Sequence, residues 1–366
     1  MRARTVPVAG PLDGLRVLDL TGQLGAYAGR LLADLGGEVT RVRHATDDLD
    51  SWPRHRRIFL EAGKWRAHAE PGSDEWNGLL QMADVLLTSA GPGELRKLRL
   101  HPEQTPGLVH TNVSGFGMAG PRAGHPHSDL TRLAAGGLLY LGGDPDREPV
   151  RPYPEQSSMA ASLHATVATL LALRRRDQTG RGDFVDVSAQ EAVAHSLENA
   201  VQYADLEGKI RRRAGAGPVE AGTGLFRCAD GWIYLVSSIG GKHLCWAEFV
   251  GWVAEEGWDE DGALAGAEWD DPVYLRTPEA VARYRAIIER FTTTRTKREL
   301  YEEGQRRGVS IAPLSSPRDL LDNPQLAALE FFVPWSVDDR EFTFPGSPYR
   351  FSRTPVMPRR LEGTVQ

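Results

Sequence analysis

Residues 15–43 read LRVLDLTGQLGAYAGRLLADLGGEVTRVR, and this stretch decides the fold. The apolar run LRVLDL predicts a short strand, and Leu31, Leu32 and Leu35 then recur at helical spacing before a glycine pair. The segment EVTRVR returns to a strand. A strand, a helix and a strand in this order form a βαβ unit, which requires a parallel sheet covered on both faces.

The same theme continues outward along the chain. WNGLLQMADVLLTS predicts a helix that feeds a buried strand, and GLVHTNVSGF predicts a further strand. Residues 158–176 predict a long helix whose apolar stripe consists of Leu163, Val167, Leu170 and Leu171. These elements predict a doubly wound α/β domain with its ligand at the carboxyl ends of the strands.

A second, smaller domain is expected after a change in composition. The segment IRRRAGAGPVEAGTG is rich in glycine and poor in large apolar residues, which is typical of a linker or mobile loop. GLFRCADGWIYLVSS follows it and predicts a hairpin that turns at Ala229 and Asp230. The expected plan is a large domain over 1–205, a linker over 206–224, a small α+β domain over 225–310 and a returning C-terminal segment over 311–366.

Composition narrows the classes of function. The chain has 366 residues and a formal net charge of −6, which argues against general nucleic-acid binding. Its 2 cysteines, Cys228 and Cys245, have no metal-binding spacing and indicate a reducing compartment. No apolar run is long enough to span a bilayer, and the N-terminus lacks a secretion signal, so we expect a cytoplasmic protein.

The glycines after the first strand are spaced GxxGxxxG at Gly22, Gly25 and Gly29, whereas a dinucleotide site would read GxGxxG. The second strand ends in basic residues, Arg41, Arg43 and His44, and not in an acid. NAD binding is therefore disfavoured. The basic groups suit a phosphate, although a tight turn with solvated arginines explains the pattern equally well.

Two further segments carry candidate residues. AGHPHSDL, residues 123–130, offers His127 and Asp129 as an acid/base pair or, less readily, as metal ligands, and Asp129 could instead be a helix N-cap. GGDPDREPV, residues 142–150, places Asp144 and Asp146 in ordinary turn chemistry, where an aspartate could also attack an acyl group. The residues alone do not choose between these interpretations.

In combination the segments resemble a known family. PLDGLRVLDL, LLADLGGEVTRV, VSGFGMAGP, SDLTRLAAGGLL, TGRGDFVDVS and FRCADGWIYL occur in this order. Together they look like the family III CoA-transferases, the group of formyl-CoA and carnitine CoA-transferases that also contains α-methylacyl-CoA racemases. The resemblance runs from about residue 11 to 358. It implies a Rossmann-like large domain, a small domain, and two ring-shaped chains interlocked as a homodimer.

The resemblance also implies a mechanism. The family's nucleophilic aspartate falls on Asp146, which would attack a thioester and form a mixed anhydride. Gln23 matches a glutamine near the reacting acyl group, and Gly215 and Gly217 lie in the segment that best matches the family's oxyanion loop. Coenzyme A and carboxylic acids are then substrates, and neither a metal nor a tightly bound cofactor is expected.

The positions that match the family's CoA contacts are Gly25, Ala26, Arg41, Arg43, His44, Ser89, Ala90 and Lys97. The chain departs from the family pattern at Ser89-Ala90, where an asparagine and an aromatic residue are usual, and at Ala69-Glu70, where a Leu-Asp pair is usual. These departures leave room for a catalytically degenerate acyl-CoA-binding or scaffold dimer.

A racemase or epimerase is the alternative enzyme, with His127 and Asp129 moving an α-proton. At the positions that match the racemases' catalytic histidine and aspartate, this chain has Ser128 and Ser158. The resemblance therefore favours a transferase over a racemase.

Overall fold

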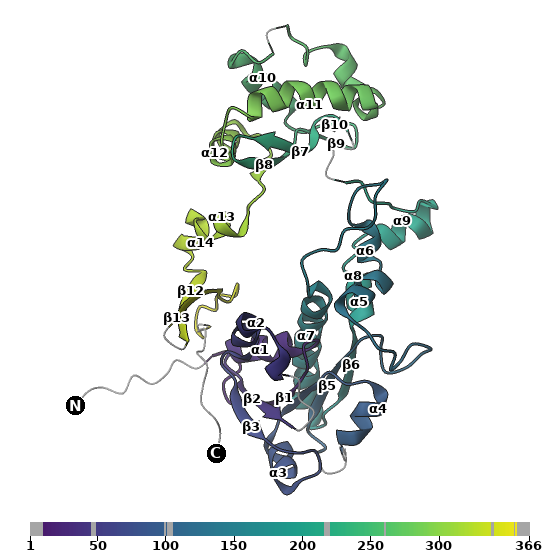
Figure 1. Cartoon of the computed structure of the whole chain (residues 1–366), viewed down its shortest axis with the longest axis vertical. Helices are drawn as coiled ribbons and strands as arrows, with labels where there is room; N and C mark the ends of the chain where they lie inside the picture. Colours follow the sequence, from purple (N-terminus) through teal and green to yellow (C-terminus); the bar gives the residue numbers. More distant parts are fainter. Residues whose placement is uncertain are drawn as a thin grey trace, which may run out of the picture. The chain divides into compact units, whose positions relative to one another are not determined.

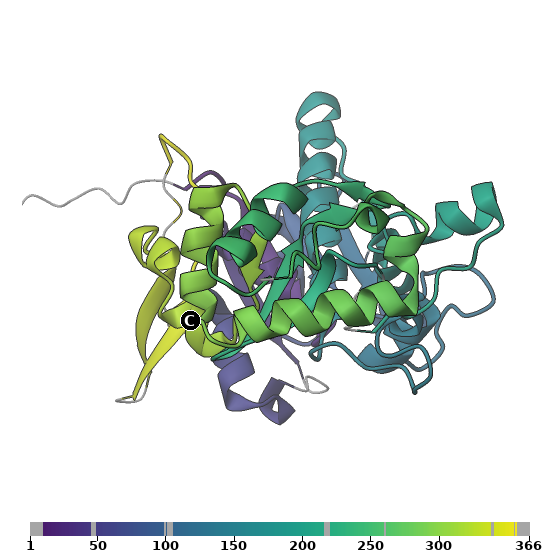
Figure 2. The same cartoon turned by 90° about the horizontal axis from the view of Figure 1, so that it is seen from above.

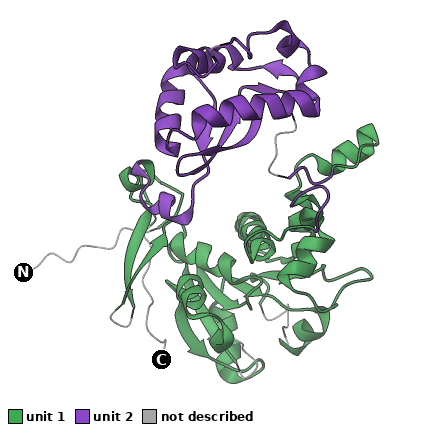
Figure 3. Cartoon of the chain, turned by 45° about the horizontal axis from the view of Figure 1, so that its top comes forward, with its two compact units in different colours: residues 1–142, 149–211, 325–366 green, residues 143–148, 212–324 purple. Residues whose placement is uncertain are grey.

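The computed structural model describes residues 10–44, 49–98, 100, 105–215, 220–259, 261–337, 340–354 and 356 (Figure 1). The chain divides into two compact units, coloured separately in Figure 3. Unit 1 contains residues 1–142, 149–211 and 325–366, and unit 2 contains residues 143–148 and 212–324. Both units are discontinuous in sequence, because the chain leaves unit 1 twice, for residues 143–148 and 212–324, and returns to it each time.

Unit 1 is built on a six-stranded, fully parallel sheet of order β3-β2-β1-β4-β5-β6. Its strands are β1 (Arg16–Leu20), β2 (Glu38–Arg43), β3 (Trp65–His68), β4 (Val85–Thr88), β5 (Val109–Ser114) and β6 (Phe184–Ser188). The βαβ unit predicted over residues 15–43 is confirmed, with α1 (Ala26–Asp34) between β1 and β2. The strand order reverses beside β1, so the carboxyl ends of β1 and β4 flank the place where such sheets bind ligands.

Unit 1 contains further helices beside α1. They are α2 (Arg54–Glu61), α3 (Asp74–Met82), α4 (Pro92–Leu95), α5 (Asp129–Ala135), α6 (Leu138–Leu141), α7 (Gln156–Thr179), α8 (Ala189–His195) and α9 (Ala200–Glu207), with short 3-10 turns η1 (Leu49–Ser51) and η2 (Arg96–Leu98). Among the helices that the structure describes, none combines the length and apolar character needed to cross a bilayer.

The long helix α7 packs on the sheet through small residues. Ala161 and Ala165 are fully buried, and the hydroxyl groups of Thr169 on α7 and Thr111 on β5 are hydrogen bonded at 2.7 Å. The larger residues predicted to form the apolar stripe point elsewhere. Leu163, Val167 and Leu171 are 45%, 57% and 65% exposed, whereas Leu170 is partly buried against the core. A close helix-to-sheet contact selects small side chains, which a pattern of large residues does not reveal.

The C-terminal segment returns to unit 1 as a hairpin, β12 (Phe332–Val337) with β13 (Arg340–Pro345), which follows α14 (Pro324–Ala328). Trp335 and Phe344 of the hairpin pack on Ile58 of α2. The guanidinium of Arg30 lies 4.9 Å from the centre of the Trp335 ring, a cation–π contact. The last strands of the chain therefore complete the packing of its first helices.

Unit 2 is a small α+β body around a three-stranded antiparallel sheet of order β11-β8-β7. Its elements are β7 (Thr223–Cys228), β8 (Gly231–Val236), β9 (Ser238–Ile239), β10 (Lys242–His243), α10 (Trp246–Glu255), η3 (Ala267–Asp270), η4 (Tyr274–Arg276), α11 (Pro278–Thr292), α12 (Lys297–Arg307), β11 (Ile311–Pro313) and α13 (Pro317–Leu321). Figure 2 looks onto α11, the long helix of this unit. Trp252, Trp269 and Tyr284 form the centre of its core, and the predicted hairpin is β7–β8.

Candidate active site

The turn after β1 and the end of β4 are tied together. The backbone N–H of Gly22 donates to Ser89 Oγ at 2.6 Å, so two of the segments expected to bind CoA are in direct contact. Ala90 is fixed in turn by Asn112 of β5, whose side-chain amide forms hydrogen bonds of 3.0 Å with both the N–H and the carbonyl of Ala90. These hydrogen bonds therefore fix the backbone at the carboxyl ends of β1 and β4.

A buried group of charges supports this turn from below. Lys64 Nζ lies 2.7 Å from Asp19 Oδ2 and 3.1 Å from Glu61 Oε1, and all three side chains are almost completely buried. Burial alone would raise the pKa of Asp19, but Lys64 and then Arg41 outweigh it and hold that pKa below its ordinary value. Asp19 Oδ1 accepts hydrogen bonds from the N–H and the hydroxyl of Thr21 at 2.9 and 2.6 Å. The network therefore sets the start of the turn.

The glycine spacing has a structural reason here. A Cβ on Gly29 would lie 2.2 Å from Asp19 Oδ2, and a Cβ on Gly25 would lie 2.8 Å from the Thr21 methyl group. Both glycines allow α1 to approach the end of β1 closely. The next residue, Ala26, is fully buried beneath the turn, so its side chain is part of the core. Only its backbone is available for the expected contact with CoA.

The basic residues expected to meet phosphate occupy two different environments. Arg41 is 2% exposed, donates to the carbonyl of Thr21 and stacks 5.7 Å from the Trp52 ring, so it belongs to the buried network. Arg43 instead lines an accessible cavity of about 390 Å³. His44 follows it and is half-buried, and Lys97 is exposed on η2.

The cavity beside Arg43 is strongly basic. Its charged lining consists of Arg43, Arg54, Arg57, Arg66 and Asp50. Asp50 bridges Arg43 at 2.8 Å and Arg57 at 3.2 Å, and the hydrogen bond from Arg43 is the largest cause of a lowered pKa at Asp50. Four guanidinium groups and one carboxylate line the described part of this cavity, and guanidinium groups are well suited to bind a phosphate. Sequence reasoning missed three of these arginines, although RHRR at the start of α2 was a visible signal.

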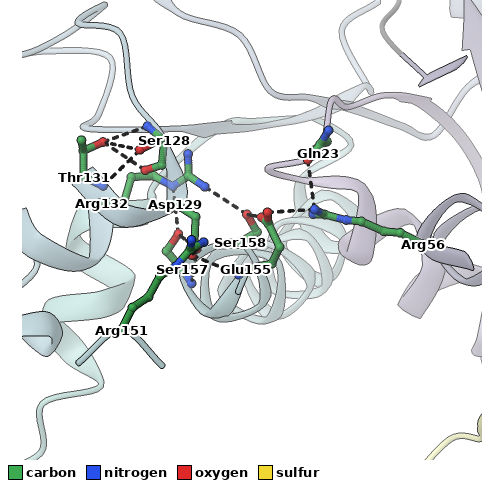
Figure 4. Close-up of polar contacts among 10 residues, drawn as sticks. All are labelled: Gln23, Arg56, Ser128, Asp129, Thr131, Arg132, Arg151, Glu155, Ser157 and Ser158. Atoms are coloured by element: carbon green, nitrogen blue, oxygen red, sulfur yellow. Dashed lines mark hydrogen bonds and ion pairs between the residues drawn. The ribbon is translucent and has the colours of Figure 1, made fainter. Parts of the chain in front are cut away.

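Gln23 belongs to a chain of polar contacts that crosses unit 1 (Figure 4). Its Oε1 accepts a hydrogen bond of 3.0 Å from Arg56, and the same nitrogen of Arg56 lies 2.8 Å from Glu155 Oε1. Ser158 Oγ donates to the other oxygen of Glu155 at 3.1 Å and accepts from Arg132 at 3.1 Å. The predicted glutamine is therefore connected to the N-terminal end of α7 by Arg56 and Glu155, and through Ser158 to Arg132 of α5.

Asp129 anchors the far end of this chain. Its carboxylate accepts hydrogen bonds from Ser157 Oγ at 2.6 Å, the N–H of Ser157 at 3.2 Å and the N–H of Glu155 at 3.0 Å, and it pairs with Arg151 at 2.9 Å. Burial would raise the pKa of Asp129, but the bonds from Ser157 and Arg151 lower it overall. The alternative that Asp129 is a helix N-cap is wrong, because Ser128 caps α5 and shares a capping box with Thr131.

His127 lies close to Asp129 in sequence but does not bond to it. Its Nδ1 accepts a hydrogen bond of 2.8 Å from Arg132, which requires a neutral ring with the proton on Nε2. Burial, followed by the charge of Arg132, lowers the pKa of His127. Within the described part of the chain, no group of three or more His, Cys, Asp or Glu side chains could hold a metal ion.

Asp146 lies in unit 2, on the loop after α6, and its side chain is exposed. Among the residues that the structure describes, no hydrogen-bond or ion-pair partner contacts its carboxylate. The glycine-rich segment packs on the same loop, because the N–H of Gly215 donates to the carbonyl of Gly143 at 3.0 Å. Gly215 has a left-handed backbone (φ 69°), and a Cβ there would lie 2.6 Å from Asp144 Oδ1. Gly217 lies outside the described residues.

Comparison with known proteins identifies the family of this chain. Residues 12–362 match the family model described as CoA-transferase family III. The chain belongs to the family III CoA-transferases. The resemblance inferred from the sequence is confirmed, and membership places the protein among the CoA-transferase enzymes.

Two curated relatives and one solved structure illustrate the likeness. The transferase is 39% identical to succinyl-CoA:(R)-benzylsuccinate CoA-transferase subunit BbsE of Thauera aromatica, over 92% of this chain and 87% of that protein. It is 33% identical to the alpha subunit of succinyl-CoA–L-malate CoA-transferase of Chloroflexus aurantiacus, over 61% of this chain and 57% of that protein. A CAIB/BAIF family protein from Brucella suis shares the fold, with a TM-score of 0.82, 24% identity and coverage of 96% and 95% of the two chains.

Proposed function

We propose that the protein transfers CoA from an acyl-CoA thioester to a carboxylic acid, with Asp146 as the nucleophile. The observation that carries this proposal is the state of Asp146, an exposed carboxylate that contacts no partner among the described residues. Its lone pairs are therefore available to an incoming carbonyl carbon. The position of Gly215 supports the proposal, because its hydrogen bond to Gly143 holds the segment that matches the family's oxyanion loop against the loop of Asp146.

The reaction proceeds in four exchanges at one carboxyl group. An Asp146 oxygen attacks the thioester carbonyl, the C–S bond breaks, and CoA thiolate leaves a mixed anhydride behind. The thiolate attacks the aspartyl carbonyl, which releases the donor acid and forms an enzyme-bound CoA thioester. The acceptor carboxylate then attacks this thioester and expels the thiolate again. The thiolate finally attacks the acceptor's carbonyl, which yields the new acyl-CoA and restores Asp146.

The basic cavity is the proposed site for the phosphates of CoA. Arg54, Arg57 and Arg66 join the expected Arg43 there, while the turn at Gly22 and Ser89 offers backbone and hydroxyl groups nearby on the same edge of the sheet. Both curated relatives are named for succinyl-CoA, so we propose succinyl-CoA as the donor and a substituted succinate such as (R)-benzylsuccinate as the acceptor.

A homodimer is the proposed assembly. The exposed residues Leu163, Val167 and Leu171 lie on one face of α7, and Phe184 on the neighbouring edge strand β6 is 47% exposed. An apolar face of this kind supports burial against another chain. Because both relatives are named as subunits, a pair formed with a different chain is the alternative assembly. The two cysteines are free and buried, which supports the expected cytoplasmic location.

The test is an Asp146→Asn variant compared with Asp144→Asn, which changes the neighbouring aspartate of the same loop. With succinyl-CoA and (R)-benzylsuccinate, we expect Asp146→Asn to lose at least about a thousandfold in kcat, since the covalent step is removed. Asp144→Asn should retain most of the activity. Hydroxylamine added during turnover should trap the wild-type enzyme as a hydroxamate at Asp146.

Three other outcomes would assign different functions. Full CoA transfer by Asp146→Asn would rule out this nucleophile. Exchange of an α-proton with deuterium, without acyl exchange, would identify the racemase alternative. The structure disfavours that reaction, because Asp129 is saturated by hydrogen bonds and does not contact His127. CoA binding without either activity would identify a degenerate binding or scaffold protein.

A further inference from the structure

Arg132 is a buried cation that lacks a carboxylate in contact. It is 5% exposed, and its guanidinium bonds to Ser157 Oγ at 2.9 Å, Ser158 Oγ at 3.1 Å and His127 Nδ1 at 2.8 Å. All three partners are neutral. Among the described residues, no carboxylate oxygen lies within ion-pair distance of Arg132. Burial lowers the pKa of Arg132, and Asp129 and Glu155 offset this only from a distance.

The carboxylate of Glu155 is connected to Arg132 through the hydroxyl group of Ser158. One oxygen pairs with Arg56 at 2.8 Å, and the other accepts from Ser158 at 3.1 Å. Ser158 links this carboxylate to Arg132. Arg56 links it to the turn after β1, because the nitrogen of Arg56 that pairs with Glu155 also donates to Gln23. Arg56 and the Ser158 hydroxyl contact this carboxylate, and Arg132 is hydrogen bonded to Ser158 behind it. Such a group of donors is typical of a binding site for a carboxylate.

The backbone of Glu155 is held in an unfavourable conformation to reach this position. Its φ of 73° and ψ of 15° are left-handed, which costs a residue with a Cβ about 1 kcal/mol or more. The hydrogen bond from its N–H to Asp129 Oδ2, at 3.0 Å, holds the backbone there. Such strain at a partly exposed polar residue is characteristic of functional sites.

We propose that Arg56, Ser158 and Arg132 bind the non-reacting carboxylate of the acceptor acid, a substituted succinate, and that Glu155 occupies this place until the acid displaces it. The inference rests on the proposed function, because it assigns a site to one of the two substrates. The Arg56 and Glu155 side chains are 15% and 24% exposed, so the pair is within reach of solvent. An external carboxylate that takes the place of Glu155 leaves Arg56 paired, so the exchange does not leave a buried charge without a partner.

The experiment measures binding of succinate to the full-length protein by isothermal titration calorimetry without CoA. Glu155→Gln removes the competing charge and should tighten succinate binding by about twofold to fivefold. Arg56→Gln should weaken it by about tenfold or more, because a charge-assisted bond is lost. The matched controls are Arg298→Gln and Glu302→Gln, which break an exposed Arg–Glu pair of 3.0 Å on α12, and they should change nothing.

Two results would overturn the site. One is unchanged succinate binding in both Glu155→Gln and Arg56→Gln, and the other is the absence of succinate binding to both the wild type and Glu155→Gln. Ser158→Ala serves as a milder second variant if Arg56→Gln fails to fold, and it should weaken binding severalfold. The same preparations are assayed for CoA transfer. If CoA transfer persists but the expected binding pattern is not found, only this acceptor site is ruled out. If the binding pattern is found but no CoA transfer occurs, only the proposed function is ruled out.

Discussion

His110 is a buried histidine on β5, beside the edge strand β6 of the sheet of unit 1. The Thr88 hydroxyl donates to Asn112 Oδ1 at 2.8 Å, so it accepts at 2.9 Å from His110 Nε2, which must carry the proton. The ring also meets Phe184 edge-on at 5.0 Å. Burial lowers the pKa of His110 from 6.5 to about 4. A neutral, fixed imidazole is therefore part of the support beneath Ala90 and the end of β4.

This shift predicts a stability change with a definite sign. The unfolded chain binds a proton at this histidine below pH 6.5, whereas folded His110 does not until about pH 4, so acid favours the unfolded chain. We expect the free energy of unfolding to fall by about 3 kcal/mol through this window from His110 alone. Urea denaturation of the wild type and of His110→Gln across this pH range isolates the contribution of His110 to the free energy of unfolding. Parallel pH profiles for the two proteins would contradict the prediction.

At the scale of elements, the contact between α1 and β1 is fixed by one glycine. Gly29→Ala would drive a methyl group into Asp19, which cannot move without breaking its bonds to Lys64 and Thr21. We expect a loss of about 3 kcal/mol in the free energy of unfolding, from overpacking and a disturbed ion network. Equilibrium urea unfolding measures this loss.

Gly78→Ala is the matched control for this change. Gly78 also lies inside a helix, α3, but a Cβ there meets nothing within 4 Å. Alanine should stabilise that helix by about 0.5 to 1 kcal/mol, because it lowers the entropy of the unfolded chain. A Gly29→Ala protein as stable as the wild type would show that α1 can shift away from β1.

Elements whose hydrophobic pattern is set by their own burial are predicted well from the sequence. β4 (VLLT) could be predicted because a parallel strand buried on both faces is a continuous apolar run, and α1 because its leucines recur at helical spacing. α7 was located correctly, but its packed face was not, since Ala161 and Ala165 are small and carry no visible hydrophobic signal. The family resemblance identified Gln23 as a candidate, whereas the contacts of Arg56 and Arg132 depend on segments that only the fold brings together.

At the scale of the whole molecule, the exposed stripe on α7 predicts how chains associate. Leu171→Glu would place a charge in the proposed interface, and burying an unpaired carboxylate is costly. We expect the dissociation constant of the dimer to rise by at least about tenfold. Light scattering after size-exclusion chromatography, over a series of concentrations, measures the change.

Met82→Glu is the control, because Met82 is a single exposed apolar residue, 54% exposed, at the end of α3. It should leave the association unchanged. A monomeric wild-type protein would favour assembly with a different chain, and a stable dimer in Leu171→Glu would place the interface elsewhere.

The return of β12 and β13 to unit 1 has a consequence for biosynthesis. Trp335 and Phe344 cover Ile58 and Arg30 of helices that leave the ribosome long before them. At ordinary elongation rates, the nascent N-terminal half waits on the order of ten seconds for its last two strands. During that interval its uncovered apolar surface is a substrate for chaperones, and a message truncated before these strands would yield a product destined for proteolysis.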